Sequence, residues 1–95
     1  MSNNIENSTS KNLEIGASQI EFLEKLSNAN AVSGDEREVR QLILDAVKPL
    51  ADEVKIDSMG NVLVKKFGKE PDRVKVMLAS HMDEVGFMVV KKQND

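Results

Sequence analysis

Apolar residues recur at helical spacing in two stretches of the chain. In the first, Ile20, Leu23 and Leu26 lie three residues apart, with Phe22 beside them. Positions three or four residues apart share one face of an α-helix. With Ser18 placed to cap the first turn, the pattern predicts a short amphipathic helix from Ser18 to about Asn28.

The second stretch carries one continuous apolar stripe. Spacings of three and four residues predict an amphipathic helix here too. Ser33, followed three residues later by Glu36, matches the capping-box signature of a helix start. Pro49 should end the helix near Lys48, because its ring removes a donor and clashes with the preceding turn. The stripe consists of Val39, Leu42, Ile43, Ala46, Val47 and Leu50.

After the helices, the pattern changes to short runs that are typical of strands. The runs 54–57 and 61–67 predict two strands joined through residues 58–60, where Gly60 can adopt a positive φ at little steric cost. Asp57 and Asn61 are common turn residues, and a role in a functional site remains an alternative for both.

Two later runs, Val74 to Ala79 and Val85 to Val90, are apolar at nearly every position. Such runs are typical of strands buried on both faces, as in the parallel sheet of an α/β protein. The sequence therefore predicts an α/β fold in which two N-terminal helices precede a β-hairpin and further strands.

The composition excludes several classes of function. Of the 95 residues, 40% are hydrophobic and 31% are charged, and the net charge of −3 argues against nucleic acid or a membrane as the main partner. Because the chain has no cysteine, it holds no disulfide, thiolate zinc site or cysteine nucleophile. With no signal-peptide pattern and no apolar segment of membrane-spanning length, we expect a cytoplasmic protein.

The only histidine interrupts the last apolar region. His81 follows the run 76–79, and Asp83, two residues further on, can reach the same side of an extended backbone. In α/β proteins, ligands bind beyond the carboxyl ends of strands, and an imidazole beside a carboxylate is a common way to build a metal site. The alternative is an ordinary hydrogen-bonded histidine, because His-x-Asp often arises by chance.

Three stretches together resemble one family of enzymes, the glutamyl and deblocking aminopeptidases. These are co-catalytic metallopeptidases that form tetrahedral dodecamers and include proteins labelled cellulase M. The resemblance covers about residues 20–90 and implies the N-terminal part of that family's α/β/α sandwich. The stretches are Ser33-Gly34-Asp35-Glu36-Arg37-Glu38-Val39-Arg40, Asp57-Ser58-Met59-Gly60-Asn61-Val62-Leu63-Val64 and Ala79-Ser80-His81-Met82-Asp83-Glu84-Val85-Gly86-Phe87-Met88-Val89.

The resemblance implies a peptidase site with two divalent metal ions, zinc or cobalt. In this family the ions share a water that attacks the peptide carbonyl next to a free N-terminus. His81 matches the metal-ligating histidine, and Asp83 matches the nearby catalytic carboxylate that supports this ligand. The implied partners are a peptide substrate and further copies of the chain in a homo-oligomer.

The chain departs from the family in length, since family members are several times longer and carry their remaining metal ligands further downstream. A catalytic zinc site normally needs three protein ligands. We therefore expect residues 19–95 to be the N-terminal part of an incomplete catalytic domain that is inactive alone. Residues 1–18 are rich in Ser and Asn and should be a disordered tail. The alternative is a non-catalytic short product that associates with a full-length homologue or another protein partner.

Overall fold

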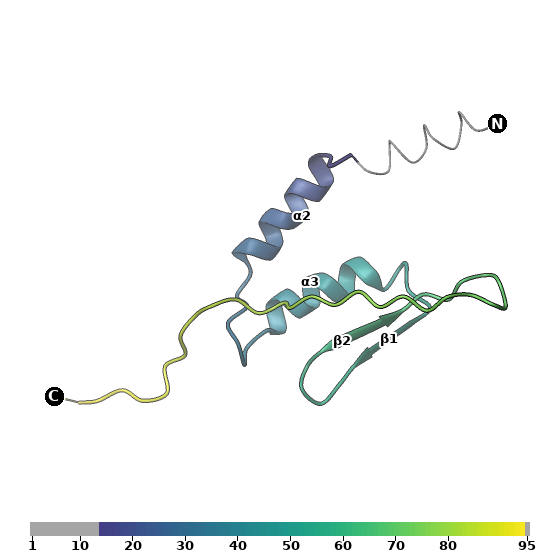
Figure 1. Cartoon of the computed structure of the whole chain (residues 1–95). Coiled ribbons are helices and arrows are strands. Elements are labelled where there is room, and N and C mark those ends of the chain that lie inside the picture. The colour runs from purple at the N-terminus through teal and green to yellow at the C-terminus, as the bar shows by residue number, and fades with distance from the viewer. Residues whose placement is uncertain (1–13, 95) are drawn as a thin grey trace.

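The computed structural model describes residues 14–94, which form two helices followed by a two-stranded sheet (Figure 1). Helix α2 spans Ala17–Asn28, helix α3 spans Arg37–Val47, and strands β1 and β2 span Glu53–Ile56 and Val62–Lys65. The predicted α/β order of two helices and a β-hairpin is confirmed. Most of the predicted tail, residues 1–13, lies outside the described residues. No helix of the described part is both long and apolar enough to cross a bilayer.

The start of helix α2 lies one residue before the predicted start, and its cap is a different residue. The backbone N–H of Gly16, at the cap position, donates to the side-chain oxygen of Gln19 at 2.9 Å. Ser18 already belongs to the first turn, and its hydroxyl donates to the same Gln19 oxygen at 3.1 Å. The predicted cap by Ser18 is therefore wrong, because a cap residue must precede the helix.

Helix α3 starts at Arg37 with Glu36 at the cap position, so the predicted cap by Ser33 is also wrong. Residues 32–35 form a separate turn, in which Gly34 has a φ of +94°. The Glu36 carboxylate accepts the Gly34 backbone N–H at 2.9 Å. Ser33 lies within this turn, three residues before the observed cap position, and helix α3 has no side-chain hydrogen bond at its cap.

The end of helix α3 agrees with the prediction. The helix stops at Val47, and the N–H of Lys48 donates to the carbonyl of Leu44 at 3.0 Å, directly before Pro49. Leu50, the last member of the predicted stripe, lies beyond the helix and is 70% exposed.

Helix α3 is covered on two sides, whereas the apolar stripe predicts only one. Val39 is 3% exposed and belongs to a small core where the two helices meet. Leu44, 6% exposed, is absent from the predicted stripe; it lies one turn after Arg40 on the side that contacts the hairpin. The core consists of Ala29, Ala31 and Val39, with Leu26, Leu42, Ile43 and Met82 packed against it.

Strands β1 and β2 pair in antiparallel register. Glu53 lies opposite Lys65, and Ile56 lies opposite Val62. The Lys65 ammonium is 3.2 Å from the Glu53 carboxylate, and the N–H of Asp52 extends the ladder by donating to Lys65 O at 2.9 Å. The hairpin is thus formed as predicted; β1 begins and ends one residue earlier than predicted, and β2 begins one residue later and ends two residues earlier.

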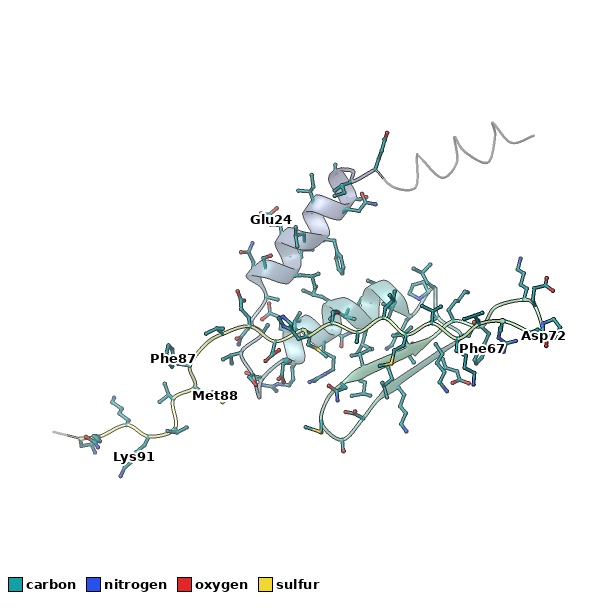
Figure 2. All side chains as sticks on the ribbon, viewed as in Figure 1. Glu24, Phe67, Asp72, Phe87, Met88 and Lys91 are labelled. Carbon is teal, nitrogen blue, oxygen red and sulfur yellow. The ribbon has the colours of Figure 1, made fainter. Side chains whose placement is uncertain are left out.

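The two further strands predicted at 74–79 and 85–90 are not formed among the described residues. Leu78 is 93% exposed and Phe87 is fully exposed, pointing away from the helices (Figure 2). A strand needs a main-chain partner, and in this region only Glu84 has one, in an isolated parallel bridge to Val32. The radius of gyration, 18.6 Å, exceeds the roughly 12 Å of a compact domain of this length. The predicted burial of these segments is therefore wrong for this structure.

Candidate metal centre

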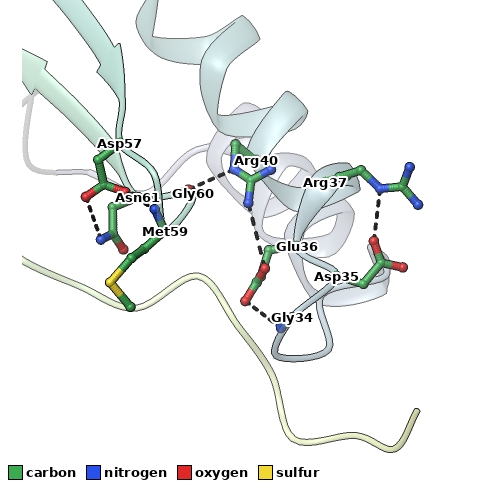
Figure 3. Close-up of polar contacts among 9 residues, drawn as sticks. All are labelled: Gly34, Asp35, Glu36, Arg37, Arg40, Asp57, Met59, Gly60 and Asn61. Atoms are coloured by element: carbon green, nitrogen blue, oxygen red, sulfur yellow. Dashed lines mark hydrogen bonds and ion pairs between the residues drawn. The ribbon is translucent and has the colours of Figure 1, made fainter. Parts of the chain in front are cut away.

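The turn between β1 and β2 forms one wall of the candidate site and is organised by a single carboxylate. Asp57 accepts the backbone N–H groups of Met59 and Asn61 at 3.0 and 2.9 Å, and the Asn61 side-chain amide at 2.9 Å (Figure 3). Gly60 has a φ of +88°, and its N–H donates to Asp57 O at 3.0 Å. The predicted turn roles are confirmed: the side chains of Asp57 and Asn61 form hydrogen bonds within the turn, and Gly60 has the predicted positive φ.

The same hydrogen bonds set the acidity of Asp57. The Asn61 side-chain amide, followed by the backbone N–H groups of the turn, lowers the pKa of the Asp57 carboxyl below its ordinary value. Each donor stabilises the carboxylate and has no equivalent partner in the neutral acid. Asp57 is therefore held as an anion that organises the turn.

Helix α3 holds this turn through Arg40. The Arg40 Nε–H donates to the carbonyl of Gly60 at 2.8 Å, and its Nη2 lies 3.7 Å from the carboxylate of Glu36 (Figure 3). Glu36 in turn accepts the N–H of Gly34. One connected set of contacts therefore joins the turn 57–61, the start of helix α3 and the loop before it.

The segment that carries His81 docks on the loop between the two helices. Met82 packs against the core cluster, and the Glu84 N–H donates to the carbonyl of Ala31 at 2.7 Å. Gly86 lies so close to Val32 that a Cβ built on it would be 2.6 Å from a Val32 methyl carbon. Although no strand forms here, the positions around His81 are fixed by contacts with residues some fifty positions earlier in the chain.

His81 and Asp83 face one another. The His81 Nδ1 lies 2.9 Å from the backbone carbonyl of Asp83 and 3.4 Å from its carboxylate Oδ1. Because both neighbours are acceptors, the neutral ring carries its proton on Nδ1, which leaves the Nε2 lone pair free. The His81 side chain is 85% exposed, and Nε2 has no hydrogen-bond partner among residues 14–94. This is the arrangement by which an acceptor orients a metal-binding imidazole.

His81 lies between two hollows in the surface. One, of about 250 Å³, is lined by Glu36, by the turn residues 59–61 and by residues 80–83. The other, of about 470 Å³, is lined by Ser33, His81 and residues 83–86. The ring is therefore accessible from both sides and is not sealed within a core.

These residues fit a metal ion as one ligand and its support, but not as a complete site. Within the described part of the chain, no three His, Cys, Asp or Glu side chains come together where one ion could bind. His81 offers Nε2, and Asp83 holds the ring, whereas a catalytic zinc site normally needs three protein ligands. The residues present thus supply part of a donor set.

Sequence reasoning did not find Glu36 and Arg40 as parts of this region. Their spacing of four residues on a helix is a recognisable signal for an ion pair. Their contacts with Gly34 and Gly60 depend on the tertiary structure, and no sequence pattern indicates them.

Comparison with known proteins defines the class to which this arrangement belongs. The family model described as M42 glutamyl aminopeptidase matches residues 60–95, which include the hairpin's second strand and the His81 segment. The chain belongs to this M42 peptidase family, as the resemblance in its sequence implies. No solved structure gives a significant match.

Curated relatives give the same result. The chain is 46% identical over 70 residues to FrvX of Escherichia coli, which is provisionally named an aminopeptidase, covering 74% of this chain and 19% of the relative. It is 46% identical over 70 residues to the lysyl aminopeptidase of Pyrococcus furiosus, covering 73% and 19%. It is 38% identical over 64 residues to the glutamyl aminopeptidase of Lactococcus lactis, covering 67% and 18%. The chain thus spans about a fifth of the length of these relatives.

Proposed function

We propose that this chain supplies the first metal-binding segment of a cytoplasmic, metal-dependent aminopeptidase. The complete site removes N-terminal residues from peptides with two divalent ions, zinc or cobalt, in a homo-oligomer of the kind that its sequence resembles. On this proposal the 95 residues alone are inactive, because they bring too few ligands to hold two ions.

The observation that carries the proposal is the geometry of His81. An exposed imidazole whose Nδ1 faces a carbonyl and a carboxylate, and whose Nε2 is free, is prepared to bind a cation. The names of the relatives, lysyl and glutamyl aminopeptidase, support peptide hydrolysis as the reaction.

The proposal assigns distinct roles to the two residues. His81 binds one ion through Nε2, and Asp83 holds the ring in the required tautomer and raises its basicity. Two bound divalent ions would polarise the peptide carbonyl and lower the pKa of a shared water. Residues that would act as the general base and remaining ligands are not assigned in this chain.

A chimera tests the proposal directly. The stretch of the Pyrococcus furiosus lysyl aminopeptidase that aligns with this chain is replaced by the corresponding residues of this chain, and hydrolysis of a lysyl chromogenic amide is measured together with bound metal. We expect an active chimera, an inactive His81→Ala variant that has lost one ion, and an Asp83→Asn variant with metal affinity reduced about 10- to 100-fold.

The matched control is Lys75→Ala, an exposed residue on the same segment that should leave activity unchanged. If the His81→Ala chimera retains its metal and its turnover, the proposed ligand role is wrong. For the 95-residue chain alone, zinc titration should show weak binding that His81→Ala abolishes, and tight stoichiometric binding would contradict the proposed lack of ligands.

A second candidate function is association with a full-length homologue or another protein partner, without catalysis. One observation favours it: the apolar side chains of the segments 74–78 and 85–90 are largely exposed, including Leu78 and Phe87. Co-elution of the separate chain with intact FrvX, lost when Leu78 is replaced by Lys, would support this candidate.

A further inference from the structure

We infer that Arg40 is a positioning residue, which fixes the turn 57–61 opposite His81 and so sets the width of one of the two hollows beside the histidine. The inference rests on the proposed metal-binding role of His81 and assigns a residue that does not itself touch the metal. It is drawn from the contacts of Arg40, the space at Gly60 and the hollow shared by the turn and the histidine.

Arg40 makes one hydrogen bond and one ion-pair contact from a single guanidinium. Nε donates to Gly60 O at 2.8 Å, while Nη2 lies 3.7 Å from Glu36 Oε2. The side chains of Arg40 and Glu36 are only 18% and 21% exposed, so water competes less for these contacts than at the surface. Arg37, on the same helix, pairs with Asp35 while its own side chain stays 85% exposed. Of these two arginines, only Arg40 is largely buried and contacts the turn 57–61.

The space at Gly60 shows how closely the guanidinium fits the turn. A Cβ at this position would lie 2.5 Å from Arg40 Nη2. The flat guanidinium therefore packs directly against the Gly60 backbone. A lysine would retain the charge, but its single ammonium cannot reproduce this planar fit together with both contacts.

The turn that Arg40 holds is a wall of the hollow that contains His81. Met59 to Asn61 line one side, residues 80–83 line the other, and Glu36 lies between them. In Figure 3 the Met59 side chain extends from the turn toward the C-terminal segment. Movement of the turn would change the width of this hollow.

Helix α3 is the common base of both walls. Val39 packs in the core against which Met82, the neighbour of His81, is placed. The next residue, Arg40, points toward the turn and binds Gly60. Two consecutive helix residues thus hold the two walls of the hollow. Because a helix is stiff, they keep the distance between the walls constant.

The test uses the whole chain with ¹³C-labelled methionine methyl groups, and Co²⁺ as the probe. A paramagnetic ion at His81 shifts nearby methyl signals according to their distance and direction. We expect Co²⁺ to shift the Met59 and Met82 signals in the wild-type chain. Arg40→Ala and the charge-matched Arg40→Lys should lose most of the shift at Met59 and keep the shift at Met82.

Arg37→Ala is the control, since it removes the same charge from the same helix without touching the turn, and it should behave as the wild type. A general loss of structure would remove the Met82 shift as well, so the selective loss distinguishes positioning from unfolding. If Met59 keeps its full shift in Arg40→Ala, the inference is overturned.

Failure of the proposed function gives a different result. If Co²⁺ binds nowhere near His81 in the wild-type chain, the metal-binding role is wrong. The position of the turn is then judged without metal, by the nuclear Overhauser effect between the Met59 methyl group and the His81 ring protons. We expect this effect in the wild type and in Arg37→Ala but not in Arg40→Ala, and an unchanged effect in Arg40→Ala overturns the inference.

Discussion

Replacing Gly60 by alanine should loosen the hairpin turn by two separate mechanisms. An L-residue at a φ of +88° costs about 1–2 kcal/mol relative to glycine. The added Cβ would also stand 2.5 Å from Arg40 Nη2, so the guanidinium must leave the Gly60 carbonyl. A hydrogen bond to a charged donor contributes about 1.5–3 kcal/mol. Together, Gly60→Ala should destabilise the turn by about 2.5–5 kcal/mol.

Amide hydrogen exchange measures this change at the turn itself. The N–H of Asn61, which donates to Asp57 at 2.9 Å, reports local opening. We expect its exchange to accelerate about 100-fold or more, up to the rate of an unfolded chain, because 1.4 kcal/mol corresponds to about tenfold. In an Arg40→Ala background the same substitution should cost only the backbone part, about tenfold.

Gly68→Ala is the matched control. Gly68 has no positive φ, and a Cβ there would meet only the flexible Arg73 side chain, at 3.0 Å. If Gly60→Ala accelerates exchange no more than Gly68→Ala, or costs the same with and without Arg40, the assigned contact between Arg40 and the turn does not stabilise it.

Two further predictions concern the turn and the docked segment. Because the pKa of the Asp57 carboxyl is lowered from its ordinary 3.8, the carboxylate stabilises the turn fully above that value, and this stability is lost as the pH falls through the lowered pKa. An NMR titration should therefore show a midpoint below 3.8, with Asp57→Asn removing the pH dependence of the Asn61 amide signal; a midpoint above 3.8 contradicts this. Gly86→Ala would place a Cβ 2.6 Å from the Val32 methyl carbon, and because valine is stiff, the segment should shift and the Glu84 amide should exchange faster. Val32→Ala in the same chain should restore protection, and failure to restore it would mean that another contact holds the segment.

The elements that sequence reasoning found are those whose cause is local. The turn depends on Asp57, Gly60 and Asn61, which lie within five positions and interact with one another. The helix end before Pro49 is equally local, because one ring removes one donor. Such features need no knowledge of the rest of the fold.

The errors arise where distant contacts decide the outcome. Leu44 is buried although it lies outside the predicted stripe, and helix α3 also contacts strand β2, which follows it in the chain, so a one-sided stripe cannot indicate this burial. The apolar side chains at 74–79 and 85–90 favour burial. A strand forms only beside a main-chain partner, and the described residues provide none for these two runs. For the candidate site, the resemblance to the aminopeptidase family indicated His81 and Asp83, because the His-x-Asp spacing alone often arises by chance. The Arg40 contact with Gly60 spans twenty positions, and only the structure shows it.

The docking of the His81 segment on the interhelical loop also orders events during protein synthesis. Its receptor, made of Ala31, Val32 and the residues around Val39, is encoded entirely before the histidine. Helices and hairpins form from local contacts far faster than a ribosome adds residues. When His81 leaves the ribosome, the loop and helix residues that orient it have therefore already been synthesised, and the His81 segment can dock on them at once.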